Sequence, residues 1–364
     1  MVVVLHEQSE TVCASARADG EHLWIDAGEF QTATGWSLKP EGFCRGTTCV
    51  PVPPGRAHEF VAGSTVNAAA FWRRMGNPVM HDATRQVWVL GTSAADRSAS
   101  LQSLEAPDFN LPDLDGRMRT LSEHRGKKVL LATWASWCGC RADLPVWQSL
   151  YADLKGSGFV VVAVAIDVPE AARPWIEAAK PDYPCLIDRD HHVADLYNML
   201  NVPQAVWIDE EGRIVRPAEN AGSSDAFRNM DRVTKQMTPE QLKERERTKS
   251  TYVAAVRDWV SKGPASEFVY DAAQVRARLR LPDTAITEAH AQFRLAQYLV
   301  RHGKRDEAVA HFSEASRLHP ESWTIWRQAA EKDATGLATG PEFWARVDAL
   351  GDRPYHRLID MKGV

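Results

Sequence analysis

Cys138 and Cys140 are the residues whose types and spacing most directly imply chemistry. The apolar run at residues 129–132 is typical of a buried strand, and a helical apolar pattern follows the two cysteines. A helix N-terminus favours thiolate over thiol, because its free amide groups and partial positive charge stabilise a negative sulfur. Since the thiolate is the reactive form, the pattern predicts a redox-active pair. The alternatives are two cysteines that only pack, or half of a metal site.

A single residue, Gly139, separates the two cysteines. Residues two apart on a regular helix point to nearly opposite sides, so we expect Gly139 to provide the freedom for a turn that brings both sulfurs together. The resulting ring is small, and strained disulfides are the more oxidising, labile ones. Two outcomes remain open. Either Cys138 and Cys140 cycle as an easily reduced disulfide, or Cys138 attacks the substrate and another thiol resolves the intermediate.

The segments around this pair resemble the thioredoxin-like domains of the TlpA/ResA type, thiol-disulfide oxidoreductases of the redoxin (AhpC/TSA) superfamily. Four segments between Leu104 and Arg216 carry the resemblance, and they cover residues 106–116, 121–131, 134–138 and 201–209. The usual active site of this family is Cys-x-x-Cys followed by Arg. Here Arg141 follows directly after a pair that is one residue shorter.

The resemblance implies a fold and a set of site residues. The fold is an α/β thioredoxin-like central domain, in which Cys138 is the nucleophile and Cys140 the resolving thiol. Trp137 belongs to the matched approach to the active site. Pro203 is expected to follow a cis peptide bond beside the cysteines, where an extended substrate or a mixed-disulfide partner could pair with the backbone. An ordinary trans proline at a strand entrance is the alternative.

Three further side chains have both a functional and a structural interpretation. Asp167 follows the apolar strand predicted at 159–166 and could accept a thiol proton, or it could cap the next helix. Arg141 could stabilise the charge of a thiolate or substrate, or form a surface salt bridge. Cys185, which precedes Leu and Ile in a predicted strand, is expected to be a core residue rather than a resolving thiol.

A thiol-dependent peroxidase of the same fold is the main alternative function. In peroxiredoxins a Thr or Ser lies three residues before the reactive cysteine, and a Pro lies seven before it. Relative to Cys138 these positions hold Ala135 and Leu131, and relative to Cys140 neither required residue is present. The sequence therefore favours a dithiol oxidoreductase.

Composition and charge limit the classes of partner that the sequence predicts. The net charge of -5 gives no reason to expect nucleic acid or an anionic membrane, and no stretch approaches the roughly 20 apolar residues of a membrane span. Because residues 1–5 are too short for a signal-peptide core, we expect a cytoplasmic protein that uses its dithiol transiently, for reduction or peroxide handling. The expected partners are a protein or small-molecule disulfide and a thiol reductant. No cofactor and no metal are expected at the redox site.

The sequence predicts a small α+β module at residues 1–100. A polar linker at 94–103 joins it to the redoxin domain at 101–220. A helix is expected at 27–34, capped by Asp26 and ended by Gly35. Cys44 and Cys49 lie in two short predicted strands and can face each other. Two free thiols are the simplest interpretation of this pair. A reversible disulfide and a soft-metal site, completed by residues such as His58, His81 or Cys13, are the alternatives.

Residues 235–364 predict an all-α region that begins with a helix at 239–262. Residues 289–320 resemble one tetratricopeptide repeat, whose small and apolar packing positions are occupied by Leu295, Ala296, Leu299, Gly303, Ala308, Phe312, Ala315 and Pro320. A single repeat cannot bury its own face. We therefore expect a helical appendage packed on the redoxin domain. A partner-peptide groove or a dimer surface, using Trp323, Trp326 and Trp344, is the alternative, and it would make the protein an interaction scaffold.

Overall fold

The computed structural model describes residues 1–362 and divides the chain into two compact units. Unit 1 contains Met1–Ser98 together with Leu281–Pro320, and unit 2 contains Ala99–Arg280 together with the described chain from Glu321 onward. Both units are therefore discontinuous in sequence. The helical region predicted at 235–364 is shared between them instead of forming one body.

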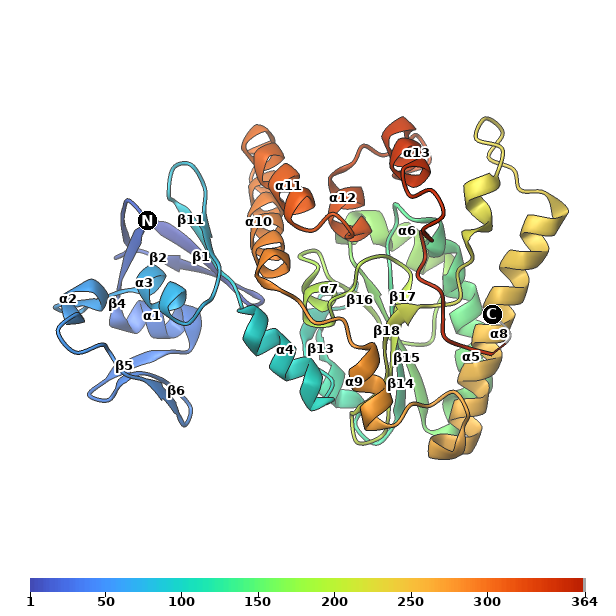
Figure 1. Cartoon of the computed structure of the whole chain (residues 1–364), viewed down its shortest axis with the longest axis horizontal. Helices are drawn as coiled ribbons and strands as arrows, with labels where there is room; N and C mark the ends of the chain where they lie inside the picture. Colours follow the sequence, from blue (N-terminus) through green and yellow to red (C-terminus); the bar gives the residue numbers. More distant parts are fainter. Residues whose placement is uncertain (363–364) are drawn as a thin grey trace. The chain divides into compact units, whose positions relative to one another are not determined.

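Unit 2 is built on a five-stranded sheet with the strand order β16-β15-β14-β17-β18 (Figure 1). Strands β14, β15 and β16 are parallel, whereas β17 and β18 are antiparallel to their neighbours. The strands are β14 (Lys128–Trp134), β15 (Phe159–Ala165), β16 (Cys185–Ile187), β17 (Gln204–Ile208) and β18 (Ile214–Asn220). Every residue of β14 and β15 is buried, as near-continuous apolar runs require when helices cover both faces. The α/β thioredoxin-like class predicted from the sequence is confirmed.

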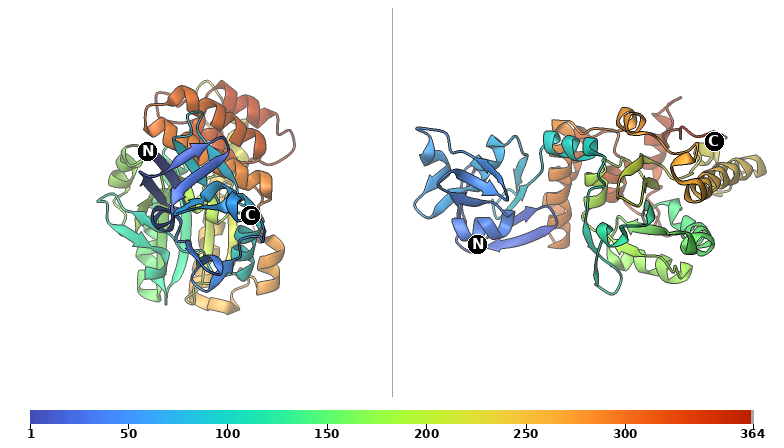
Figure 2. Two further views of the ribbon diagram at one scale, coloured as in Figure 1. Left: turned by 90° about the vertical axis from the view of Figure 1, so that its left-hand side faces the viewer. Right: turned by 90° about the horizontal axis from the view of Figure 1, so that it is seen from below.

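Alternate residues of β14 enter two cores on opposite faces of this sheet. Leu130 and Ala132 belong to the core that α5, α6 and α8 cover, and Val129 and Leu131 belong to the core that α4, α7 and α9 cover (Figure 1 and Figure 2). The helices are α4 (Ala94–Ser103), α5 (Leu144–Leu154), α6 (Pro169–Ala179), α7 (His192–Leu196), α8 (Pro239–Lys262) and α9 (Ala272–Arg278). A separate two-stranded sheet comprises β12 (Asn110–Pro112) and β13 (Met118–Thr120).

The polar segment at 94–103, which the sequence identified as the linker, contains the boundary between the two units and forms a helix, α4. The Ser93 hydroxyl accepts a hydrogen bond from the Asp96 amide at 3.1 Å and donates one to the Asp96 carboxylate at 2.8 Å. This reciprocal cap, together with alanine-rich composition, stabilises a helix where polarity alone indicated a flexible connection. The boundary between the units falls inside α4, after Ser98.

Unit 1 contains three small sheets, with the strand orders β10-β11-β1-β2, β3-β4-β9-β8 and β5-β6-β7. Its strands are β1 (Val2–His6), β2 (Ser9–Cys13), β3 (Arg17–Asp19), β4 (His22–Asp26), β5 (Ser37–Lys39), β6 (Gly42–Arg45), β7 (Thr48–Val50), β8 (Val61–Ala62), β9 (Thr65–Asn67), β10 (Val79–His81) and β11 (Val87–Leu90). Its first helices are α1 (Ala27–Thr34), α2 (Ala57–Phe60) and α3 (Ala68–Arg74). The predicted α+β character is confirmed.

The predicted limits of α1 are confirmed to the residue. The Asp26 side chain accepts a hydrogen bond from the Gly28 amide at 2.9 Å, and Gly35 ends the helix with a φ of 73°. Local capping chemistry therefore determines this element.

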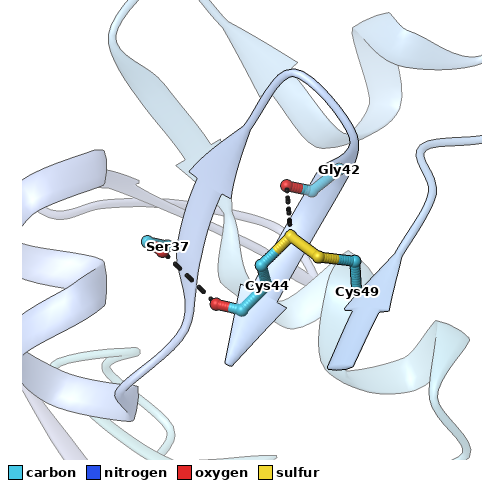
Figure 3. Close-up of a disulfide and its surroundings, with 4 residues drawn as sticks. All are labelled: Ser37, Gly42, Cys44 and Cys49. Carbon is cyan, nitrogen blue, oxygen red and sulfur yellow. Dashed lines mark hydrogen bonds between the residues drawn. A yellow bond between two sulfur atoms is a disulfide. The ribbon is translucent and has the colours of Figure 1, made fainter. Parts of the chain in front are cut away.

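Cys44 and Cys49 form a disulfide between β6 and β7 (Figure 3). The interpretation as two free thiols is therefore wrong, because the antiparallel register places these residues directly opposite each other. Sulfurs that are bonded to each other are not available as metal ligands. Residues 1–362 contain no group of three His, Cys, Asp or Glu side chains arranged to hold a metal ion.

Helices α10 (Thr284–Arg301) and α11 (Arg305–Leu318) cover one face of the β10-β11-β1-β2 sheet. Leu5, Val87 and Val89 of that sheet form a buried cluster with Leu295 and Leu299 of α10. The sequence suggested a helical appendage on the redoxin domain, and the structure shows this helix pair packed on the sheet of unit 1. The apolar face of the unit 1 sheet needs a cover, and the repeat-like hairpin needs a surface to bury its own face.

Leu295→Ala is expected to destabilise unit 1 by about 2–5 kcal/mol, because Leu295 is fully buried in this cluster and its truncation leaves a cavity. Chemical denaturation of the full chain, followed by the transition assigned to unit 1, measures the change. Val309→Ala on α11 is the matched control, since Val309 is 57% exposed and its truncation should cost below about 0.5 kcal/mol. Equal effects of the two substitutions would contradict the assignment.

The last helices, α12 (Trp323–Ala329) and α13 (Pro341–Asp348), belong to unit 2 (Figure 1). The Trp323 amide donates to the Leu200 carbonyl oxygen at 2.7 Å, and the Ala338 amide donates to the Trp137 carbonyl oxygen at 3.0 Å. For this final segment the expected packing on the redoxin domain is confirmed. Within residues 1–362, none of the helices has the length and apolar character needed to cross a membrane.

Candidate active site

Cys138 lies at the junction that the sequence predicted, between β14 and the first helical turn. It is the N-cap residue of a short 3-10 helix, Gly139–Asp143, and α5 begins immediately after that turn. The Cys140 amide donates a hydrogen bond to the Cys138 sulfur at 3.4 Å. A backbone donor therefore points at the sulfur, as stabilisation of a thiolate at a helix start requires.

Gly139 does not have the role that the spacing suggested. Its φ is not in the left-handed region, and a Cβ added to it would meet open space. The two sulfurs are brought together by the extended conformation of Cys138 (φ -112°, ψ 145°), which precedes the 3-10 turn. The pair therefore lies outside regular helix, where the geometric objection to a bridge between positions two apart no longer applies.

The pKa values of the two thiols are shifted in opposite directions. Burial raises the pKa of Cys138, but a hydrogen bond from the Cys140 thiol, the positive charge of Arg327 and the Cys140 amide outweigh it and lower that pKa to about 6. Burial, the Cys138 thiolate and the charge of Asp143 raise the pKa of Cys140 well above its ordinary value. At neutral pH, Cys138 is therefore the thiolate and Cys140 holds the shared proton.

Arg327, on α12, provides the positive charge beside the thiolate. Its side chain is buried, and its Nη2 atom donates to the carbonyl oxygen of Trp137 at 2.9 Å, one residue before the nucleophile. Its Nε atom is buried and has no hydrogen-bond partner among the described residues. No carboxylate is among the charges that raise the pKa of Arg327, whereas Tyr355 and the two cysteines are. Since a buried cation needs a compensating charge, the Cys138 thiolate is its counter-ion.

The contacts around Arg327 fix its position. Its Nη1 atom donates to the Tyr355 hydroxyl at 3.0 Å, and that hydroxyl donates to the Asn201 side-chain oxygen at 3.3 Å. The Trp137 indole donates to the side-chain oxygen of Gln328 at 2.5 Å. Trp137 therefore anchors α12, and through α12 the guanidinium, to the active-site turn.

Asp143 is the carboxylate whose charge contributes to the raised pKa of Cys140. It lies three residues after Cys140 in the same turn, is buried, and accepts a hydrogen bond from Lys249 at 2.8 Å. Lys249 lies on α8 and also donates to the Ala221 carbonyl oxygen at 2.8 Å. Asp143 is therefore a buried acid, held by a lysine, whose charge favours the protonated form of Cys140.

Among the other predicted site residues, Pro203 is brought to the cysteines. The Val202–Pro203 peptide bond is cis, as expected, and the Cys138 sulfur lies 3.5 Å from the Val202 carbonyl oxygen. Pro203 also lines the cavity above both sulfurs.

For three other predicted residues, Arg141, Asp167 and Cys185, the surroundings indicate a structural role. Arg141 donates to the carbonyl oxygens of Ser136 and Thr335, each at 2.9 Å, and stacks over an indole ring. The Asp167 carboxylate accepts hydrogen bonds from the Ser136 amide, the Ser136 hydroxyl and the amide of the next residue. Burial raises the pKa of Cys185 to about 12, so this core thiol is protonated at neutral pH.

A cavity of about 280 Å³ opens above Cys138 and Cys140. Only a few of its lining residues precede residue 216, and the rest come from the segments at 222–249 and 327–356. Cys138 and Cys140 are each 6% exposed at its floor. The reactive thiols are therefore reached through a chamber that the later part of the chain encloses.

The part of the chain that contains Cys138 and Cys140 is similar to known proteins. The AhpC/TSA family profile matches residues 103–216, and a tetratricopeptide repeat profile matches residues 289–331. The thiol-disulfide oxidoreductase ResA of Geobacillus kaustophilus is 33% identical over 121 residues, which make up 33% of this chain and 70% of that protein. The chain belongs to the ResA family of thiol-disulfide oxidoreductases. ResA of Halalkalibacterium halodurans is 29% identical over 148 residues, 40% of this chain and 84% of that protein.

One solved structure is similar to part of this chain. The thioredoxin domain of a thiol-disulfide oxidoreductase from Bacteroides vulgatus is 29% identical, with a TM-score of 0.29 over 31% of this chain and 84% of that one. The shared region ends before the segments that enclose the cavity. Most of the residues that line the cavity therefore lie outside the part of the chain that matches the AhpC/TSA family profile.

Sequence reasoning missed four side chains of this site, namely Asp143, Lys249, Arg327 and Tyr355. The position of Asp143, one turn after Cys140, was a signal that could have been used. No local signal identified Arg327, because the sequence around it predicts only a short helix that packs against its neighbours.

Proposed function

We propose that the protein exchanges disulfides through Cys138 as nucleophile and Cys140 as resolving thiol. The single observation that carries this assignment is the position of Cys138 at the start of the 3-10 turn, where the Cys140 amide donates a hydrogen bond to its sulfur at 3.4 Å. A thiolate is the attacking species in disulfide exchange, and the second thiol is within reach to release the product.

The reaction has two balanced steps. The Cys138 thiolate attacks one sulfur of the substrate disulfide. The S–S bond of the substrate breaks, a mixed disulfide with Cys138 forms, and the first substrate thiolate leaves. Cys140 then loses its proton to the first substrate thiolate and attacks the Cys138 sulfur, which forms the Cys138–Cys140 disulfide and releases the second substrate thiolate. Two electrons pass from protein to substrate, and an external thiol reductant restores the dithiol.

The pH dependence of alkylation tests the assignment. Reactivity of Cys138 toward iodoacetamide should follow the thiolate fraction, with a midpoint near pH 6, and should be lost as the pH falls through that value. Mass spectrometry of the modified peptide reports which cysteine reacts. Cys138→Ser should remove both this reactivity and disulfide reductase activity. A midpoint near the ordinary value of 9.0, or activity that survives in Cys138→Ser, would overturn the proposal.

Several expectations from the sequence stay predictions. They are a cytoplasmic location, an antioxidant role, peroxide handling, and a partner or dimer contact through the C-terminal helices. A peroxidase function has no additional support at this site, because Ala135 and Leu131 occupy the positions of the hydroxyl residue and the proline.

A further inference from the structure

We propose that the cavity over Cys138 selects an anionic, low-molecular-weight disulfide, held by Arg245 on α8 at the cavity wall. The inference rests on the proposed function and adds a substrate class to it. It is drawn from the shape of the cavity, the charges that line it and the burial of the sulfurs.

The volume of the cavity suits a small molecule. At about 280 Å³ it lies near the lower end of the range of roughly 300–1,000 Å³ that is typical of small-molecule sites. Its walls include the aromatic side chains of Phe227, Phe343 and Trp344, which provide apolar surface around a few polar groups. Such a mixture favours a ligand with both apolar and charged parts.

The charges in the cavity point to an anion. Four cationic side chains, those of Lys235, Arg245, Lys249 and Arg327, line it together with a single carboxylate, Asp143, although the chain as a whole has a net charge of -5. The concentration of positive charge in this chamber is therefore local. A cleft with low-dielectric walls and a positive charge that no neighbouring anion compensates attracts anions.

Arg245 is the cation of the cavity lining that is available to bind a substrate. Lys249 pairs with Asp143 at 2.8 Å, Lys235 pairs with Asp333 at 2.7 Å, and Arg327 faces the thiolate. Arg245 is exposed and forms no ion pair within the described part of the chain. Its guanidinium can therefore bind a carboxylate or another anionic group of the ligand without breaking an existing pair.

The burial of the thiols disfavours a folded protein as the substrate. Each sulfur-bearing residue is only 6% exposed, and both lie on the floor of the chamber. A disulfide within a folded partner would have to enter this space together with its flanking backbone. A small disulfide enters without that obstacle.

The test compares two small disulfides in the full chain. Glutathione disulfide carries carboxylates, and 2-hydroxyethyl disulfide is uncharged. We expect the wild type to favour glutathione disulfide in kcat/KM, and the preference to shrink as ionic strength rises. Arg245→Gln should lower the ratio of the two kcat/KM values by about fivefold, near the upper limit for an exposed ion pair, and Arg245→Glu should lower it further. Arg247→Gln, on the same helix but outside the cavity lining, should leave the ratio unchanged.

The outcomes separate the two proposals. Reduction of both disulfides through Cys138 without a preference, or an equal change of the ratio in the Arg245 and Arg247 variants, overturns the substrate class and leaves the proposed function standing. Reduction of the disulfides of insulin faster than either small disulfide also overturns the substrate class. Failure of Cys138 to reduce any of them overturns the proposed function itself.

Discussion

Arg327→Met is expected to raise the pKa of Cys138 from about 6 toward its ordinary value of 9.0. The guanidinium is the one full positive charge among the main influences on this thiol, and burial would then favour the neutral form. At pH 7 the thiolate fraction of the wild type is about nine-tenths, and a rise of the pKa to about 8 lowers it about tenfold. The rate of alkylation at pH 7 should fall accordingly. Thiolate absorbance at 240 nm, followed against pH, measures the shift directly.

Two variants make this expectation specific to the charge of Arg327. Arg327→Lys keeps a cation in place and should retain most of the lowered pKa. Arg141→Met removes the arginine that the sequence nominated, but its guanidinium is engaged by the carbonyl oxygens of Ser136 and Thr335 and should matter little for Cys138. An unchanged thiol pKa in a folded Arg327→Met protein would exclude the counter-ion role.

The same substitution should also shift the reduction potential. Arg327 stabilises the reduced, thiolate form of the pair, and oxidation of Cys138 leaves the buried cation without that counter-ion. A protein whose reduced form is stabilised is the stronger oxidant. Arg327→Met should therefore make the potential of the Cys138–Cys140 couple more negative, as measured by equilibration with a glutathione redox buffer.

Cys140→Ser is expected to trap the mixed disulfide between Cys138 and the substrate. The first attack needs only the Cys138 thiolate, and a serine hydroxyl preserves a hydrogen-bond donor beside it, but serine cannot displace the substrate sulfur. Turnover should fall by about a hundredfold or more, because release then depends on external thiols. Intact-mass measurement after a brief exposure to a disulfide should show one bound substrate half.

Cys185→Ala is the matched control for this experiment. Cys185 is a buried thiol of the same domain whose pKa is raised to about 12, so its loss should leave turnover within about twofold of the wild type. The result that contradicts the pairing is the reverse pattern, in which Cys140→Ser turns over normally and Cys185→Ala accumulates the mixed disulfide. In that case Cys185 would be the resolving thiol.

Local patterns predicted the elements whose stability is local. The run Phe159–Ala165 is apolar throughout and forms a fully buried strand. Helix α1 begins and ends at the cap residues, Asp26 and Gly35, that its sequence predicts. The segment at 94–103 was identified as the connection between the units, but its helical structure was not predicted, because polarity was weighed without the reciprocal cap of Ser93 and Asp96 that stabilises α4.

It was harder to predict which surfaces pack against each other than to predict the helices and strands themselves. The repeat-like hairpin was identified, but the surface that it covers was not. Its apolar face fits any uncovered apolar surface, and the sequence shows neither which sheet face is left bare nor that Leu5, Val87 and Val89 provide it. The cross-strand disulfide was left open for a related reason, because it depends on the register that places Cys44 opposite Cys49.

The sequence by itself determined the chemistry of this protein. The strand that runs into a helix start with Cys138 and Cys140 at the junction is a local pattern, because its parts are adjacent in sequence. The cis peptide bond before Pro203 was expected from the family resemblance. Only the tertiary structure decided what makes that chemistry selective. Arg327 and Arg245 reach the site from helices far along the chain, since burial and charge compensation act through space and leave no mark in the local sequence.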